Sequence, residues 1–247
     1  MLLYGKTLYS VRSLKLCVGR HQDMIRRISS LGRKPSATRM LREKSKKDIV
    51  LDAAEHMFAH KGYHGASVRD IFRVAGVSTG LMTYYFSSKE DLFGQAVTRK
   101  LEDFRSLFHR MMDEVPDRDN RVFEVFNKYI YFFFFNAFCP ETTMKDYTLL
   151  LANCASVYDE QIVSEVFEKF DFIFNRTFKE LKISDPGLDD DKIRATIFYL
   201  ESAVTTIMLT DRFREKRLGA TNAAALDRFI VNMAEFYADG LTGKQTH

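Results

Sequence analysis

The sequence predicts an all-α fold, and three observations support this prediction. Apolar residues recur at helical spacing along almost the whole chain, a pattern that is typical of amphipathic helices. Among the 247 residues there are only 4 prolines and 12 glycines, so few positions interrupt a helix. No stretch alternates apolar and polar residues between turn signals, as half-buried strands would. We therefore expect about nine helices and no sheet.

Three short helices are predicted near the start of the regular pattern. The first ends at Gly62, a typical C-terminal stop, and its apolar face consists of Ile49, Val50, Ala53, Ala54, Met57 and Phe58. Ser67 and Asp70 form a capping box that begins a second helix, which ends at Gly76. Ser78 caps a third helix, of about eight residues.

A long fourth helix is predicted from Ser88 to about Met112, with Ser87 and Glu90 as its capping box. Pro116 lies in a break that follows it. Apolar stripes then predict five more helices, separated by Pro140 and by an Asp185-Pro186-Gly187 turn among other breaks; they cover about residues 121–138, 144–154, 162–181, 190–212 and 221–240.

Charge is distributed unevenly along the chain. Residues 1–47 contain thirteen Lys and Arg against only Asp23 and Glu43, whereas the chain as a whole carries a net charge of +4. A basic arm before a mildly acidic body suggests a polyanionic partner at the N-terminal end. We expect residues 1–42 to be a disordered extension. An organellar transit peptide has the same composition, and a start of translation at Met24 or Met40 is a further alternative.

Cysteine content and hydropathy indicate a cytoplasmic protein. Cys17, Cys139 and Cys154 are an odd number at no metal-like spacing, which fits a reducing compartment. No segment approaches the roughly 18 apolar residues of a membrane span, so no membrane partner is expected. The densest apolar run, Tyr129–Phe135, predicts a helix at the centre of its domain.

The second and third helices have the pattern of a helix-turn-helix. Ala75 is small enough for two helices to cross closely, Gly76 permits the turn, and Val77 fills the space between the helices. Ser78 then begins a helix whose N-terminal end can enter a major groove.

Four segments resemble the DNA-binding domain of the TetR family of transcriptional regulators. They are Ala53–Tyr63, Ser67–Ile71, Ala75–Gly80 and Tyr85–Leu92, in the family's order and spacing. The resemblance implies a homodimeric, all-helical repressor with a variable ligand-binding domain. It divides the chain into a helix-turn-helix domain over 43–92 and a ligand-binding and dimerisation domain over 93–247.

The resemblance also implies which side chains contact DNA. Arg69 corresponds to a base-reading position, and Thr83 stands where the family usually has Tyr. The groove-facing positions are Thr79, Gly80, Thr83 and Tyr84, and the backbone-contacting positions are Ser67, Ser78, Tyr84 and Lys89. Lys89 has a physical argument of its own, because a phosphate at a helix N-terminus would be held by the lysine and by free backbone amides.

The C-terminal half contains enough aromatic residues to line a large, mostly apolar ligand site, although plain core packing is an alternative for each of them. The candidate ligand-binding residues are Phe108, Phe126, Tyr129, Phe133, Asn136, Tyr147, Phe170 and Phe174. Tyr129, Asn136, Tyr147 and Asn153 are the candidate polar anchors, since each needs a hydrogen-bond partner if buried. The last two helices are expected to form the dimer interface.

His56, His60 and His64 are spaced by four residues, and the first two share a helix face. Gly62 displaces His64, and no Cys or carboxylate nearby in the sequence completes a tetrahedral set. The pattern therefore favours surface histidines, with no metal and no cofactor.

Three classes of function are compatible with these features. A ligand-responsive repressor that binds a palindromic operator as a dimer is favoured. An enzyme with an accessory DNA-binding module is a second class, but the sequence has no nucleophile elbow, phosphate loop or metal motif. An architectural DNA-binding protein without a ligand is the third.

Overall fold

The computed structural model describes residues 44–138, 142–154, 160–210 and 223–243, and every regular element within these ranges is a helix. This confirms the all-α fold. The basic N-terminal segment, Cys17 and Cys139 lie outside the described residues. The described residues from Lys46 onward form one compact unit.

The three N-terminal helices begin and end close to the predicted positions. They are α3 (Lys46–Gly65), α4 (Val68–Val74) and a third segment composed of a 3₁₀ turn, η1 (Thr79–Leu81), followed by α5 (Met82–Tyr85). Gly62 leaves the helical conformation at φ 69° and Gly76 ends α4 at φ 64°, in the left-handed region that favours glycine. The Ser67 hydroxyl accepts a hydrogen bond from Asp70 N at 3.1 Å, as the capping box predicts.

The fourth helix differs from its prediction, because it is divided in two. α6 (Lys89–Thr98) and α7 (Leu101–Asp113) meet at Arg99 and Lys100. Lys100, with φ −109° and ψ 9°, is not helical. The capping residue of α6 is Ser88, which accepts from Asp91 N at 3.1 Å, so the cap lies one residue later than expected.

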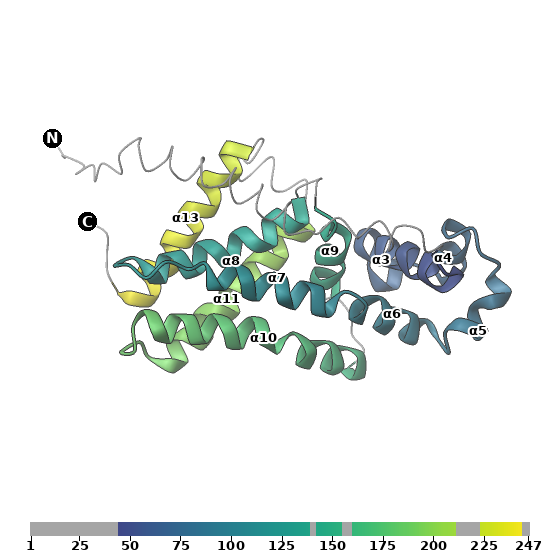
Figure 1. Cartoon of the computed structure of the whole chain (residues 1–247), viewed down its shortest axis with the longest axis horizontal. Coiled ribbons are helices and arrows are strands. Elements are labelled where there is room, and N and C mark those ends of the chain that lie inside the picture. Colours follow the sequence, from purple (N-terminus) through teal and green to yellow (C-terminus); the bar gives the residue numbers. More distant parts are fainter. Residues whose placement is uncertain (1–43, 139–141, 155–159, 211–222, 244–247) are drawn as a thin grey trace. The chain divides into compact units, whose positions relative to one another are not determined.

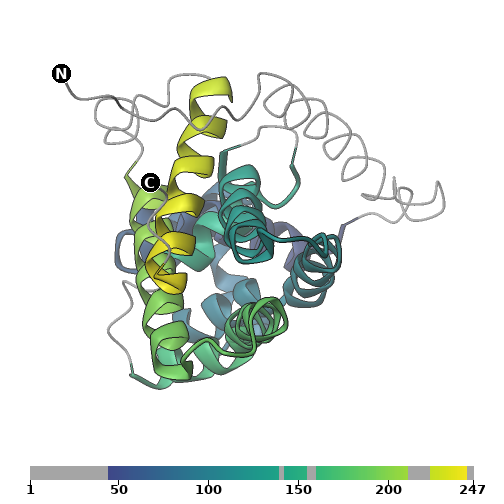
Figure 2. The ribbon, with the colours of Figure 1, turned by 90° about the vertical axis from the view of Figure 1, so that its left-hand side faces the viewer.

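Five longer helices form the C-terminal half: α8 (Arg121–Phe138), α9 (Lys145–Cys154), α10 (Glu160–Ser184), α11 (Asp190–Leu209) and α13 (Ala223–Thr242). α7, α8 and α10 run side by side, and α3, α4 and α5 are grouped beyond α6 (Figure 1). In Figure 2, α7, α8 and α10 are seen nearly end-on, with α11 and α13 running across them. α8 contacts α7, α9, α10, α11 and α13, which confirms its predicted central position.

Cys154 is a packing residue. Its side chain is buried on α9, and its Sγ donates to Leu150 O at 3.4 Å. Burial raises the pKa of the thiol to about 12, so it stays protonated near neutral pH.

None of the described helices is both long enough and apolar enough to span a membrane.

Candidate nucleic-acid interface and effector core

The turn between α4 and the third segment is held by backbone hydrogen bonds and aromatic packing. Gly76 N donates to Arg73 O at 3.2 Å, and Val77 N donates to Phe72 O at 3.1 Å. Phe72 and Phe86 are both buried, and their ring centroids lie 6.4 Å apart in an edge-to-face arrangement. Phe86 therefore anchors the end of α5 against α4, which fixes the direction of the short segment between them.

This anchoring leaves most of the predicted DNA-contacting side chains in solvent. Tyr84 is 77% exposed, the highest value among the large hydrophobic side chains of the described residues. The exposed members of the predicted set are Ser67, Arg69, Ser78, Thr79, Gly80, Thr83 and Tyr84, all on α4, η1–α5 or the residues just before them. The helix-turn-helix thus presents short polar side chains, one arginine and one aromatic ring to solvent.

Gly80 and Arg69 differ from neighbours that have structural roles. A Cβ added at Gly80 would meet Ser78 Oγ at 3.6 Å, an ordinary contact, so the fold itself does not require glycine there. The guanidinium of Arg73 pairs with Asp70 at 2.7 Å, whereas Arg69 forms no ion pair with any described residue. Both features are expected where a surface is adapted to an external partner.

Lys89 lies at the first position of α6, and its Nζ lies 4.4 Å from the centroid of the Tyr63 ring. The Tyr63 hydroxyl in turn donates to Glu90 at 2.6 Å. Partial burial lowers the pKa of Lys89 from its usual value. The contact with the ring holds the ammonium group at the start of α6, where Ser88 already caps the amide of Asp91.

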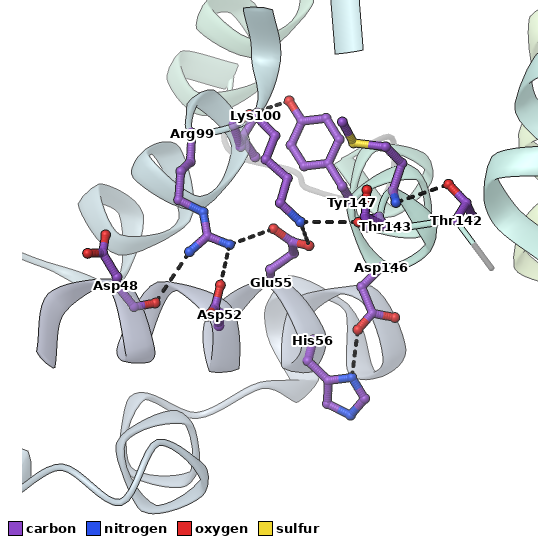
Figure 3. A network of polar contacts seen from close by, with 12 residues as sticks. Asp48, Asp52, Glu55, His56, Arg99, Lys100, Thr142, Thr143, Asp146 and Tyr147 are labelled. Carbon is purple, nitrogen blue, oxygen red and sulfur yellow. Dashed lines mark hydrogen bonds and ion pairs between the residues drawn. The ribbon is translucent and has the colours of Figure 1, made fainter. Parts of the chain in front are cut away.

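The break between α6 and α7 is tied to α3 by a buried carboxylate (Figure 3). Glu55 on α3 is only 5% exposed, and its two oxygens accept from Arg99 Nη2 at 2.9 Å and from Lys100 Nζ at 2.5 Å. Arg99 also pairs with Asp52 at 2.7 Å, and Lys100 reaches Thr143 O at 3.4 Å. The helix-turn-helix is therefore joined to the C-terminal half by a charged junction.

This junction replaces the continuous helix that the sequence predicts as the link between the two halves. A straight helix from Ser88 to Met112 would carry Arg99 and Lys100 on two neighbouring faces. The break lets both cations converge on Glu55, so that the buried carboxylate has two partners. Sequence periodicity alone does not reveal this, because the apolar stripe continues through the break.

An aromatic cluster fills the space between α7, α8, α9 and α10. Its centre is Phe104 and Phe108 of α7, whose ring centroids lie 5.1 Å and 5.2 Å from that of Phe132 on α8. Five predicted ligand residues join it through ring contacts: Phe108, Tyr129, Phe133, Tyr147 and Phe170. Phe126 instead contacts Tyr237 of α13, and Phe174 stacks with Phe178.

Three of the four predicted polar anchors are satisfied within the protein. The Asn136 amide donates to Phe132 O and accepts from Thr142 Oγ1, both at 2.9 Å. Tyr147 donates to Val97 O at 2.6 Å, and Asn153 donates to Ala59 O at 2.9 Å. The bonds of Tyr147 and Asn153 connect helices, those of Asn136 lie within α8 and to Thr142 in the loop after it, and together they account for these polar groups without a ligand.

The fourth anchor, Tyr129, leads to a residue that the sequence analysis missed. Its hydroxyl is hydrogen-bonded to Glu201 of α11. Burial raises the pKa of Glu201 to about 7, and the Asp171 carboxylate adds to the rise, whereas the Tyr129 bond opposes it. Only the pairing with Tyr129, across 72 positions of the chain, distinguishes Glu201 from other glutamates of amphipathic helices.

A separate cleft of about 680 Å³ opens between the end of α3 and the helices α8, α9 and α11. Its lining includes His60, Phe138, Asn153 and Met208, and none of the eight predicted ligand residues. The cleft and the aromatic cluster are therefore different places in the fold.

Comparison with protein families and known proteins agrees with this arrangement. Residues 50–96 match the model of the family described as bacterial regulatory proteins, tetR family. The fatty acid metabolism regulator protein of Bacillus subtilis (strain 168) is 24% identical over 168 residues, which are 66% of this chain and 84% of that protein. The regulator RutR of Escherichia coli (strain K12) is 42% identical over 59 residues, or 24% of this chain and 27% of RutR.

Solved structures resemble the fold over most of the chain. The fatty acid degradation regulator FadR from Bacillus halodurans has a TM-score of 0.55 at 20% identity, covering 78% of this chain and 98% of that one. FadR from Bacillus subtilis, solved in complex with stearoyl-CoA, has a TM-score of 0.53 at 18% identity, covering 80% and 99%. At such identities the likeness concerns the fold.

Proposed function

Because its helix-turn-helix makes this chain a member of the tetR family of bacterial regulatory proteins, we propose that it is a ligand-responsive transcriptional repressor. It binds a palindromic operator as a homodimer in the cytoplasm and is released by a largely apolar effector. Residues 43–92 bind DNA, and residues 93–247 bind the effector and form the dimer. The relatives are regulators, and we propose no catalytic activity.

The observation that carries the DNA-binding role is the exposure of the predicted contact side chains on a rigidly anchored segment. Tyr84 is 77% exposed while Phe86, two residues later, is 1% exposed. The exposed ring contributes little to the packing of the core, so it is available to an external partner. A ring held in solvent beside Thr79 and Thr83 suits contact with phosphates and base edges in a major groove.

Exposed aromatic rings on the last two helices support the dimer. Phe198 and Tyr199 on α11 are 64% and 63% exposed, and Phe236 on α13 is 73% exposed. The two helices are in contact, and Tyr237 donates to Tyr199 O at 3.2 Å. Burial of these rings against a second copy would remove apolar surface from water and form an isologous interface.

The aromatic cluster and the relatives support an effector with a long acyl chain. One relative is a fatty acid metabolism regulator protein, and a structure of similar fold is a FadR in complex with stearoyl-CoA. Rings from α7, α8 and α10 supply the apolar surroundings that an alkyl chain requires. If the alkyl chain of the effector separated these helices, it would displace α7 and thereby shift the α6–α7 junction.

Selection of duplexes from a random-sequence library tests the DNA-binding role with the full-length protein. We expect enrichment of an inverted repeat whose half-sites lie about one helical turn, roughly 34–36 Å, apart. Enrichment of unrelated duplexes with no two-fold repeat would contradict a dimeric operator-binding function.

The effector is tested on the selected duplex by fluorescence anisotropy. Stearoyl-CoA is expected to release the DNA, whereas coenzyme A alone, which has the same charged group without the chain, is expected to leave it bound. Equal effects of the two compounds would contradict recognition of an acyl chain by the aromatic cluster.

A further inference from the structure

Three potential metal-ligating side chains meet where α3 packs on α9. His56 Nδ1 lies 2.9 Å from Asp146 Oδ2, and His60 Nε2 lies 3.0 Å from Asp146 Oδ1. The ligand atoms of all three residues lie within 4.8 Å of one another. Figure 3 shows His56 reaching from α3 toward Asp146 at the start of α9. No local pattern of the sequence marks this carboxylate, because it is 86 residues or more away along the chain.

Both sides of the cluster are held in place by other contacts. His56 and His60 are four residues apart on α3, which places them on the same helix face, with ring centroids 4.5 Å apart. Asp146 lies in the first turn of α9. Two hydrogen bonds hold α9 and the residues just before it against α3 and the α6–α7 break. Lys100 donates to Thr143 O, and Asn153 donates to Ala59 O. Little rearrangement is therefore needed to bring the three ligands together.

The donor set and its spacing suit a first-row transition metal. Two imidazoles and one carboxylate combine nitrogen and oxygen donors, which favours Zn²⁺, Ni²⁺ or Co²⁺ over the all-oxygen preference of Ca²⁺ and Mg²⁺. Metal–ligand bonds of about 2.1 Å place neighbouring ligands about 3.0–3.4 Å apart, for octahedral and tetrahedral ions respectively. His56 and His60 contact different oxygens of Asp146, at 2.9 and 3.0 Å, so each imidazole nitrogen lies at the lower edge of this range from one carboxylate oxygen.

We propose that His56, His60 and Asp146 form a binding site for a divalent transition-metal ion such as Zn²⁺. Side-chain exposures of 55%, 43% and 31% let water complete the coordination shell. The bound ion joins α3, the first helix of the helix-turn-helix domain, to α9 of the C-terminal half. Three protein ligands with open positions also let the ion exchange with solvent, so the site responds to metal concentration.

Metal binding is measured with the full-length, tag-free protein after treatment with a chelator, and without DNA or effector. Calorimetry with ZnCl₂ is expected to give one ion per chain. Co²⁺ is expected to produce visible absorption bands that Zn²⁺ removes. When Zn²⁺ stands about a hundredfold above its Kd, the melting temperature is expected to rise by about 5–10 °C.

Substitutions locate the ion. His56→Gln, His60→Gln and Asp146→Asn are each expected to weaken Zn²⁺ binding by at least about tenfold. His64→Gln is the matched control, because it removes a histidine four residues beyond His60 that lies past the break in α3 at Gly62, and it should leave the affinity unchanged. Circular dichroism and the metal-free melting temperature show that each variant folds.

The proposal is overturned if His64→Gln weakens binding as much as His60→Gln does, or if the wild-type protein binds no ion. In that case His56, His60 and Asp146 serve only as hydrogen-bonded contacts between α3 and α9. Because these measurements need neither operator nor effector, their outcome is independent of the proposed repressor function.

Discussion

Exposure separates the residues of the helix-turn-helix into two groups with different roles. Phe72 and Phe86 are buried and determine how α4 and α5 pack, whereas Arg69, Thr79 and Tyr84 point into solvent. Substitutions in the first group act on stability, since they leave a cavity. Those in the second group are expected to act on DNA binding alone.

Arg69→Ala is expected to weaken binding to the selected duplex by about 1–3 kcal/mol, because a base contact is lost. Arg73→Ala is the matched control on the same helix. It removes the same charge, but from a side chain that pairs with Asp70. Anisotropy titrations of both variants at one salt concentration make the comparison, and equal losses would indicate a general charge effect instead of base recognition.

Glu201→Gln is expected to change how stability depends on pH. Because the folded pKa of Glu201 is raised from 4.5 to about 7, the folded state holds an extra proton between these values. The wild-type protein therefore loses stability as the pH rises from about 4.5 to 7. Glutamine keeps an acceptor for Tyr129 and has no charge to bury, so the variant should be more stable at pH 8 by about 1–3 kcal/mol.

Urea unfolding at pH 5 and pH 8 measures this difference, which should be small at the lower pH. Glu168→Gln, an exposed position on α10, serves as the control and should unfold like the wild type at both values. A stabilisation of Glu201→Gln that was equal at pH 5 and pH 8 would show that the carboxylate is not the cause.

At the scale of elements, the α6–α7 break joins the two halves of the protein together with the packing of α3 on α9. α6 packs on α3, and α7 packs on α8 and α10, so the break lies between two sets of contacts. Arg99 and Lys100 both pair with Glu55, and these two ion pairs offset the cost of burying its carboxylate. A ligand that displaces α7 would therefore move α3 and α6 with it.

Glu55→Gln is expected to lower the free energy of unfolding by about 1–3 kcal/mol, since Arg99 and Lys100 lose a charged acceptor in a buried position. Glu102→Gln on α7 is the control, because Glu102 is 76% exposed and pairs with Arg105 at 3.5 Å. Loss of an exposed pair should change stability by less than about 1 kcal/mol. Indistinguishable denaturant midpoints for the two variants would argue against the junction.

The whole molecule is expected to be a two-fold dimer in which α11 and α13 lie at the interface. This arrangement brings together the exposed rings of Phe198, Tyr199 and Phe236 from two copies. It also sets the distance between the two helix-turn-helix domains, on which recognition of two half-sites depends.

Phe236→Glu is expected to shift the protein from dimer to monomer, because a carboxylate at the centre of an apolar interface is costly to bury. Light scattering at micromolar concentration gives the mass directly. Tyr84→Glu is the control, since it places the same charge on an equally exposed ring of the helix-turn-helix and should leave the dimer intact. A monomeric wild-type protein would contradict the interface.

Effector and operator are expected to weaken each other by the same factor. An effector shifts the equilibrium only by its different affinities for the DNA-bound and released forms, and linkage makes this coupling reciprocal. Calorimetry of stearoyl-CoA with and without the selected duplex measures this factor for effector binding. Anisotropy of the duplex with and without stearoyl-CoA measures it for DNA binding. Equal effector affinity in both titrations would refute the coupling while leaving DNA binding itself unaffected.

The sequence alone determined the helix-turn-helix and every described helix except the divided fourth one, because most of their signals are local. Ser67 caps α4 and Gly76 ends it through contacts within a few residues, and the apolar stripe of 121–138 made α8 central. The sequence placed Tyr84 at a groove-facing position only through the resemblance to the TetR family, and its exposure is a finding of the structure.

Only the tertiary structure decided which distant side chains meet. Three contacts join residues that lie far apart along the chain. Lys100 at the break meets Glu55 across 45 positions, Tyr129 meets Glu201 across 72, and His56 meets Asp146 across 90. Hydrophobic periodicity reports which face of each helix is buried, but not the helix that covers it. Such polar contacts depend on how helices pack, and packing is set by the sum of many weak contacts across the core.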